Sequence, residues 1–270
     1  MKNLKGRVEI AGNNHLETLR NCVGYYTCPK TPGGQRLGPL VGYTARYEGP
    51  DGKKLQFVGD TYANFAMAEP WPHVLKFFAT ELARLLDERL GLDNIDVACG
   101  APIGGYSLAD ALGLVTESFL VVKAEKKVFE LATADSREVS QPVFGRHTIE
   151  KGQRVIVVED VCNNFSTTNL LLGRIMLLGG IPVAIASFLN RSLTVDDVYT
   201  AKRELRPDFA DIPGLEGLQL PVISLVRQPI PEWRQDDPAV AADIAKGNVV
   251  WKPKDKWDDL MLAMDAATQQ

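Results

Sequence analysis

Short apolar runs alternate with amphipathic stretches through the middle of this 270-residue chain, and this alternation constrains the fold more than any other feature. The apolar runs are strand candidates, and they lie at residues 95–99, 119–122, 155–158, 183–189 and 222–226. Between them, residues 108–112 and 166–178 have the apolar spacing of helices. Strands that alternate with helices predict an α/β fold with a parallel sheet flanked by helices on both faces.

A longer helix is predicted before this region, over residues 72–90. Its apolar side chains recur every 3.6 residues, Pro72 suits a first turn, and Gly91 suits a helix end. Further upstream, apolar and polar residues alternate over residues 41–47, and turn residues separate them from an apolar segment at 55–58. This pattern predicts a β-hairpin.

The length allows one large domain, or one domain with an appended subdomain. We divide the chain into an N-terminal region at 1–70 that contains the hairpin, a core at 71–228, and a C-terminal extension at 229–270. In the extension, Trp257, Leu260, Met261 and Met264 recur at helical spacing. Such a stripe favours packing on the core or on a second subunit over cofactor binding.

Charge, hydrophobic runs and cysteine spacing narrow the possible partners and the cellular compartment of the protein. The net charge of −4 and the pI of about 5.5 argue against a nucleic-acid partner. No run of 18 or more apolar residues exists, so no membrane span is expected, and residues 1–14 lack a signal-peptide pattern. The four cysteines form no C-x-x-C pair, which favours buried free thiols in a reducing compartment: Cys22, Cys28, Cys99 and Cys162. We therefore expect a soluble, cytoplasmic protein.

Two adjacent carboxylates, Glu159 and Asp160, follow the apolar strand at 155–158, and a polar loop then opens a helix. Neighbouring carboxylates repel each other, so stability gives no reason for the pair, whereas sugar hydroxyls can donate to both. The amides and the positive end of the helix favour a phosphate. Side-chain donors are also present there: Asn163, Asn164, Ser166, Thr167 and Thr168. A solvated strand end with a helix cap explains the loop but not the acids. The segment therefore predicts a site for ribose 5-phosphate.

This segment resembles the phosphoribosyl-pyrophosphate signature of type I phosphoribosyltransferases. That signature has an apolar strand, two acids, an apolar pair that Val161 and Cys162 match, and a phosphate loop. The family usually has glycine where this chain has Phe165 and Ser166. Glycine lets a backbone approach a phosphate or take a positive φ. Phe165 must therefore point away from the phosphate, or the phosphate must sit differently.

Two further loops match the resemblance. Residues 99–105 contain three glycines and a proline, and by position Gly104 and Gly105 match the pyrophosphate loop of the family. Orotate phosphoribosyltransferases have a basic segment after the next strand, and it is matched here by Lys123, Lys126 and Lys127. In those enzymes it leads into a mobile loop that reaches the partner subunit's active site, here residues 129–148. Ammonium groups stabilise a pyrophosphate leaving group, although a solvated charged turn also explains the segment.

The resemblance also implies residues that contact the base. Arg191 follows the fourth core strand, where orotate enzymes have an arginine that contacts the orotate carboxylate. An arginine in a surface loop is the alternative. The N-terminal region would form a hood over the base, and Lys54 matches a base-contacting lysine there. Tyr62, Asn64 and Phe65 are further matches, although Tyr62 and Phe65 also suit a core.

As a whole, the resemblance implies a homodimeric, Mg²⁺-dependent orotate phosphoribosyltransferase of pyrimidine nucleotide biosynthesis. It would convert phosphoribosyl pyrophosphate and orotate to orotidine 5′-phosphate and pyrophosphate. Lys123, Lys126, Lys127 and Asp160 would be catalytic, and the acid pair would hold the ribose hydroxyls. Mg²⁺ would bridge substrate oxygens and keep several waters, without an assigned protein ligand. The alternatives are another base, such as a purine, or a non-catalytic regulator that senses phosphoribosyl pyrophosphate.

Overall fold

Two units make up the part of the chain that the computed structural model describes, which is residues 7–130, 139–203 and 212–268. The first unit contains residues 7–67 and 230–268. The second contains the remaining described residues, between 68 and 229. None of the described helices is both long and apolar enough to cross a lipid bilayer.

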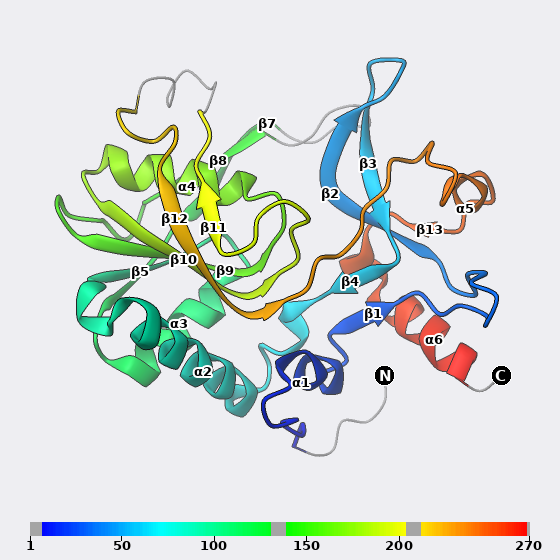
Figure 1. Cartoon of the computed structure of the whole chain (residues 1–270), viewed down its shortest axis with the longest axis horizontal. Coiled ribbons are helices and arrows are strands. Elements are labelled where there is room, and N and C mark those ends of the chain that lie inside the picture. The colour runs from blue at the N-terminus through cyan, green and yellow to red at the C-terminus, as the bar shows by residue number, and fades with distance from the viewer. Residues whose placement is uncertain (1–6, 131–138, 204–211, 269–270) are drawn as a thin grey trace. The chain divides into compact units, whose positions relative to one another are not determined.

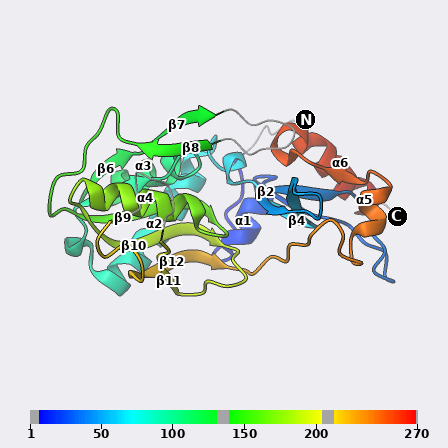
Figure 2. The ribbon, with the colours of Figure 1, turned by 90° about the horizontal axis from the view of Figure 1, so that it is seen from above.

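The second unit is built on a six-stranded sheet with the order β11-β12-β10-β9-β5-β6 (Figures 1 and 2). Neighbouring strands are parallel from β12 to β6, and only the edge strand β11 (Val198–Thr200) is antiparallel. The parallel strands are β12 (Gln219–Arg227), β10 (Ile181–Asn190), β9 (Arg154–Cys162), β5 (Val97–Gly100) and β6 (Leu120–Lys123). The predicted parallel sheet and its α/β class are confirmed.

Helices cover both faces of this sheet. Helices α2 (Pro72–Leu90) and α3 (Gly105–Thr116) lie on one face, and α4 (Ser166–Leu177) lies on the other (Figures 1 and 2). Helix α2 has the predicted bounds. Helix α3 extends beyond the predicted 108–112 at both ends, to Gly105 and to Thr116. Its first turn was not predicted, because Gly105 to Ser107 have little apolar periodicity.

Strand β9 extends beyond its apolar run. Val155 to Val158 are fully buried, and the strand then continues through Glu159 and Asp160 to Cys162. Strand β10 pairs with this whole length, and its last residue, Asn190, lies opposite Cys162. The prediction that the strand ends before the acid pair is therefore wrong, because pairing with a neighbour holds the polar residues in the ladder.

The order of the strands creates a switch point between β5 and β9. From β5 the chain passes through α3 to β6 on one side, whereas from β9 it passes through α4 to β10 on the other. Ligands of open α/β sheets bind at the carboxyl ends of the strands at such a point.

An antiparallel ribbon, β7 (Glu125–Glu130) with β8 (Val139–Val143), follows β6. The mobile loop predicted over 129–148 contains strand residues at 129–130 and 139–143, and its mobility stays a prediction. Residues 131–138 of the predicted loop lie outside the described part of the chain. The ribbon is tied to α4, since Arg174 Nη2 donates to Gln141 Oε1 at 2.8 Å.

The first unit contains the predicted hairpin, β2 (Leu40–Glu48) with β3 (Lys54–Gly59). Strand β13 (Val249–Val250) joins β2 in parallel, and β1 (Tyr25–Thr27) pairs with β4 (Thr61–Ala63). Its helices are α1 (His15–Asn21), α5 (Ala241–Ala245) and α6 (Trp257–Thr268). Trp257 and Leu260 of α6 pack on the buried core of this unit, with residues of the N-terminal region such as Tyr26 and Val41, and not on the core predicted at 71–228.

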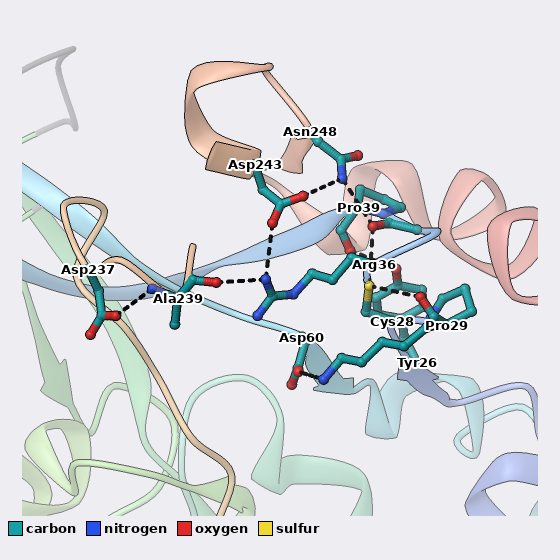
Figure 3. A network of polar contacts seen from close by, with 12 residues as sticks. Tyr26, Cys28, Pro29, Arg36, Pro39, Asp60, Asp237, Ala239, Asp243 and Asn248 are labelled. Carbon is teal, nitrogen blue, oxygen red and sulfur yellow. Dashed lines mark hydrogen bonds and ion pairs between the residues drawn. The ribbon is translucent and has the colours of Figure 1, made fainter. Parts of the chain in front are cut away.

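A polar network holds the C-terminal segment within the first unit (Figure 3). Arg36 Nη1 donates to the Ala239 carbonyl at 2.7 Å and pairs with Asp243 at 3.0 Å. Asn248 bonds both Asp243 and the Gly38 carbonyl. The bonds of Arg36 and the bond from Asn248 to Gly38 join residues about 200 positions apart in the sequence. The cysteines meet the expectation from sequence, since all four are free and buried: Cys22, Cys28, Cys99 and Cys162.

Candidate ligand-binding site

The loop between β5 and α3 folds back against β9. Ala101 N donates to the Val158 carbonyl at 2.9 Å, and the peptide bond between Pro102 and Ile103 is cis. A Cβ atom on Gly104 would lie 2.3 Å from Cγ of Asp160, and one on Gly105 would lie 2.0 Å from the Val158 carbonyl oxygen. Glycine is therefore needed at both positions. The structure thus brings the predicted pyrophosphate loop and the second acid of the pair into contact.

The two acids of the pair point in different directions, because side chains alternate along a strand. Glu159 faces α4, where its Oε1 accepts a hydrogen bond from Thr168 Oγ1 at 3.2 Å. Only 9% of Glu159 is exposed. Asp160 faces the loop at Gly104 and is half-buried. The sequence places the acids side by side but does not show that only one of them faces this loop.

Burial also changes the charge of the pair. Desolvation, and to a smaller extent the nearby charge of Asp160, raise the pKa of Glu159 to about 8, although the hydrogen bond from the Thr168 hydroxyl acts against both. Glu159 therefore holds its proton at neutral pH. Because Glu159 is protonated, it does not repel the Asp160 carboxylate as two charged neighbours would.

The loop after β9 turns at Phe165, whose backbone is left-handed with φ 59° and ψ 17°. This conformation costs a non-glycine residue about 1–2 kcal/mol. The Phe165 ring is buried and stacks on Tyr199, with ring centroids 4.8 Å apart. The ring thus points into the core, which is the first of the two possibilities drawn from the sequence.

The polar side chains of this loop divide into an outer and an inner group. Asn164 and Ser166 are exposed, Asn163 and Thr167 are half-buried, and Thr168 is buried against Glu159. Ser166 N donates to Asn164 Oδ1 at 3.1 Å, so this side chain already bonds one amide at the start of α4.

The three predicted lysines lie on β6 and β7. Lys123 Nζ pairs with Asp110 of α3 at 2.6 Å and lies 5.7 Å from the centroid of the Tyr106 ring. Lys126 and Lys127 are exposed on β7, and Lys127 lies over the Phe129 ring. The pairing of Lys123 with Asp110 is not visible in the sequence.

Arg191 lies at the same edge of the sheet as the acid pair. Its backbone N–H donates to the Cys162 carbonyl at 2.9 Å, and its side chain is buried. This burial does not fit the surface-loop alternative. Asn190 fixes the turn that follows, since its side-chain amide donates to the Val195 and Asp196 carbonyls.

Lys54, by contrast, is part of the first unit. It lies on β3 and pairs with Glu48 of β2 at 2.5 Å, and both side chains are exposed. Phe65 is fully enclosed in the same unit, as a core residue would be, and Asn64 is also buried.

Tyr199 and Asn169 support the loop after β9, although the sequence analysis did not single them out. Tyr199 Oη donates to Asn169 Oδ1 at 2.9 Å. Asn169 could have been found, because a polar residue interrupts the apolar side of the predicted helix there. Tyr199 gives no such signal, since its strand is only three residues long.

The residues present are compatible with Mg²⁺ held mainly by a substrate. Among the described residues, no group of three or more His, Cys, Asp or Glu side chains is arranged to hold a metal. Asp160 is the acid of the pair that faces the loop. Mg²⁺ is commonly bound by one or two carboxylates together with substrate phosphates and water, and such a set fits this edge.

The sheet, its switch point and the acid-bearing loop define the class: the chain has the α/β fold of type I phosphoribosyltransferases, and the predicted resemblance is confirmed. The chain is 28% identical to the orotate phosphoribosyltransferase of Caldanaerobacter subterraneus subsp. tengcongensis over 137 residues. The match covers 49% of this chain and 62% of that protein, so this chain spans less than two thirds of the relative.

Solved structures give further likenesses. The UMP synthase of Leishmania donovani has a TM-score of 0.46 at 13% identity, covering 81% of this chain and 36% of that one. The adenine phosphoribosyltransferase of Thermoanaerobacter pseudethanolicus has a TM-score of 0.41 at 17% identity, covering 62% and 88%. No protein-family model matches the chain.

Proposed function

We propose that the chain is a phosphoribosyltransferase that moves ribose 5-phosphate from phosphoribosyl pyrophosphate to a ring nitrogen of a base and releases pyrophosphate. The observation that supports this most is the contact between the Gly104 backbone and the Asp160 carboxylate at the switch point. In this proposal the glycine turn would bind an anion and the neighbouring carboxylate would accept bonds from sugar hydroxyls, with the polar loop next along the same strand.

The acid pair would hold the ribose hydroxyls. Asp160 is the principal acceptor in this proposal, because the Glu159 carboxyl already accepts the Thr168 hydroxyl. The loop at 163–168 would hold the 5-phosphate through its amides, the start of α4, and its outer side chains.

Pyrophosphate would bind at the backbone around Gly104, and lysine charge would stabilise it as it leaves. Lys126 and Lys127 are exposed and would supply this charge. Lys123 lies at the end of β6, where it pairs with Asp110. No side chain has to act as a nucleophile, since positioning and charge stabilisation suffice for this transfer. When bound, Mg²⁺ would neutralise charge on the pyrophosphate and ribose oxygens, and Asp160 would face it.

We further propose orotate as the base, with orotidine 5′-phosphate as the product. Arg191 supports this choice, because a guanidinium group can bind a carboxylate through two hydrogen bonds. The relative that is 28% identical is an orotate phosphoribosyltransferase. The corresponding biological setting is pyrimidine nucleotide synthesis by a cytoplasmic homodimer.

The test is pyrophosphate release from phosphoribosyl pyrophosphate with Mg²⁺ and a panel of bases. Asp160→Asn should lower kcat/KM by about 10–100-fold, the range for losing hydrogen bonds to a charged group. Asp259→Asn, at an exposed carboxylate on α6, should leave it unchanged. Unchanged turnover in Asp160→Asn contradicts the sugar-binding role.

The same assay tests the choice of base. Arg191→Ala should weaken turnover of orotate more than turnover of purines, because only orotate offers a carboxylate to the guanidinium. Equal losses for all bases would contradict orotate as the substrate but not the transfer reaction.

A further inference from the structure

Phe165 takes a backbone conformation that glycine usually supplies. Its φ is 59°, and the next residue, Ser166, begins α4. The turn at Phe165 therefore sets the directions of the amides that open the helix, and these amides belong to the phosphate loop of the proposed function. An L side chain disfavours this turn, so other contacts must hold it.

Tyr199 makes those contacts at two points. Its ring stacks on the Phe165 ring at 4.8 Å with an angle of 15° between planes, and both rings are buried. Its hydroxyl donates to Asn169 Oδ1, and Asn169 N in turn donates to the Phe165 carbonyl at 2.8 Å. The Tyr199 side chain, from β11, thus contacts the first turn of α4 at both ends, at Phe165 and at Asn169.

A second bond fixes Asn169 in the same place. Its Oδ1 also accepts from Lys202 N at 2.9 Å, and its Nδ2 donates to the Lys202 carbonyl at 3.0 Å. The segment that follows β11 is therefore bonded to α4 through Asn169, and Glu159 of β9 is bonded to α4 through Thr168.

We propose that Tyr199 is a positioning residue for the phosphate loop: with Phe165 it forms an aromatic pair that holds the left-handed turn where glycine would otherwise be needed. This inference rests on the proposed function of that loop. It means that Tyr199, on β11, fixes the conformation of a phosphate loop that contains no glycine.

Two substitutions of Phe165 distinguish the effect of losing the aromatic ring from the effect of strain in the left-handed turn. Phe165→Gly and Phe165→Ala both remove the ring, but only glycine adopts the left-handed turn without strain. Binding of ribose 5-phosphate, measured by titration calorimetry, should therefore be about 5–30-fold weaker in Phe165→Ala than in Phe165→Gly. A purely structural role for the ring would weaken both variants equally.

The role of Tyr199 is tested by substitution, with the same substitution at another buried tyrosine, Tyr26, as the control. Tyr199→Leu should raise the Kd for ribose 5-phosphate about tenfold, the effect of losing one aromatic pair together with its hydrogen bond. Adding Phe165→Gly to it should restore part of that affinity. Tyr26 is equally buried in the first unit and donates to the Pro39 carbonyl (Figure 3), so Tyr26→Leu should lower stability but leave this Kd unchanged.

A milder variant covers the case in which Tyr199→Leu does not fold. Tyr199→Phe keeps the ring stack, and its Kd for ribose 5-phosphate should lie within about threefold of the wild-type Kd. The reason is that Lys202 N still donates a hydrogen bond to Asn169 Oδ1. If the wild-type protein does not bind ribose 5-phosphate, the proposed function of the loop fails. If it binds and Phe165→Gly equals Phe165→Ala, or Tyr199→Leu binds like wild type, only the positioning role fails.

Discussion

At the scale of single residues, the carboxyl of Glu159 couples the site to the stability of the fold. Its pKa is about 8 in the folded protein and near 4.5 in the unfolded chain. Between these values the folded state keeps a proton that the unfolded state has lost. This raised pKa means that stability falls as the pH rises from about 4.5 to about 8, and the full cost is present above that range.

Glu159→Gln should remove this pH dependence, because glutamine accepts the Thr168 hydroxyl without ionising. We expect the Tm of wild type to fall relative to that of the variant between pH 5 and pH 9 by at least about 3 °C, the shift that roughly 1 kcal/mol produces in a chain of this size. Thermal unfolding over that pH range measures it. Parallel curves for the two proteins would show that Glu159 is ionised in the folded state.

Gly104 is a residue at which even a methyl group should disturb the site. A Cβ there would lie 2.3 Å from Asp160 Cγ, so Gly104→Ala must displace the loop or the carboxylate. We expect kcat/KM for phosphoribosyl pyrophosphate to fall about 100-fold, the cost of a misplacement of about 1 Å. Gly33→Ala is the control, since its nearest neighbouring atom would be 3.8 Å away. Equal activity of both variants would contradict a role for this contact.

At the scale of elements, a charged pair joins the amino ends of the neighbouring strands β5 and β9. Asp96 Oδ1 pairs with Arg154 Nη2 at 2.8 Å, and its Oδ2 accepts from Arg154 N at 2.6 Å. Hydrogen bonds from Arg154 lower the pKa of Asp96 to about 2. Its stabilising effect is therefore present above its ordinary value of 3.8 and is lost as the pH falls through about 2.

Asp96→Asn should accordingly lower the Tm at pH 7, and the difference from wild type should disappear as the pH approaches 2. Asp93→Asn is a close comparison, because it removes a charge that acts on Arg154 but leaves the bond from Arg154 to the Asp93 carbonyl in place. A Tm difference that stays constant down to pH 2 would show that the ion pair does not contribute through its charge.

The elements that sequence could predict are those with strong apolar periodicity. Helix α2 and the buried strands β9, β10 and β12 are of this kind. The acid pair could also be found, because it directly follows the apolar run of β9. Strand β8 was missed because its sequence, VSQPV, has neither an apolar run nor a clean alternation. Phe165 was recognised as a departure, but its partner Tyr199 depends on a packing contact between distant segments.

At the scale of the whole molecule, the sequence could not show which distant segments share a unit. Residues 230–268 belong with residues 7–67 because Arg36, Asp243 and Asn248 meet there (Figure 3). Likewise, the switch point follows from strand order and not from any one motif, and only this order brings Gly104 to Asp160. The proposed activity therefore depends on an arrangement that no single segment encodes.

The most direct measurement of that arrangement is a crystal structure of the protein with phosphoribosyl pyrophosphate bound. We expect ribose hydroxyls within about 3 Å of the Asp160 carboxylate, the 5-phosphate on the amides of residues 164–168, and the pyrophosphate at Gly104. A sugar bound elsewhere, with Asp160 making no contact to it, would contradict the account.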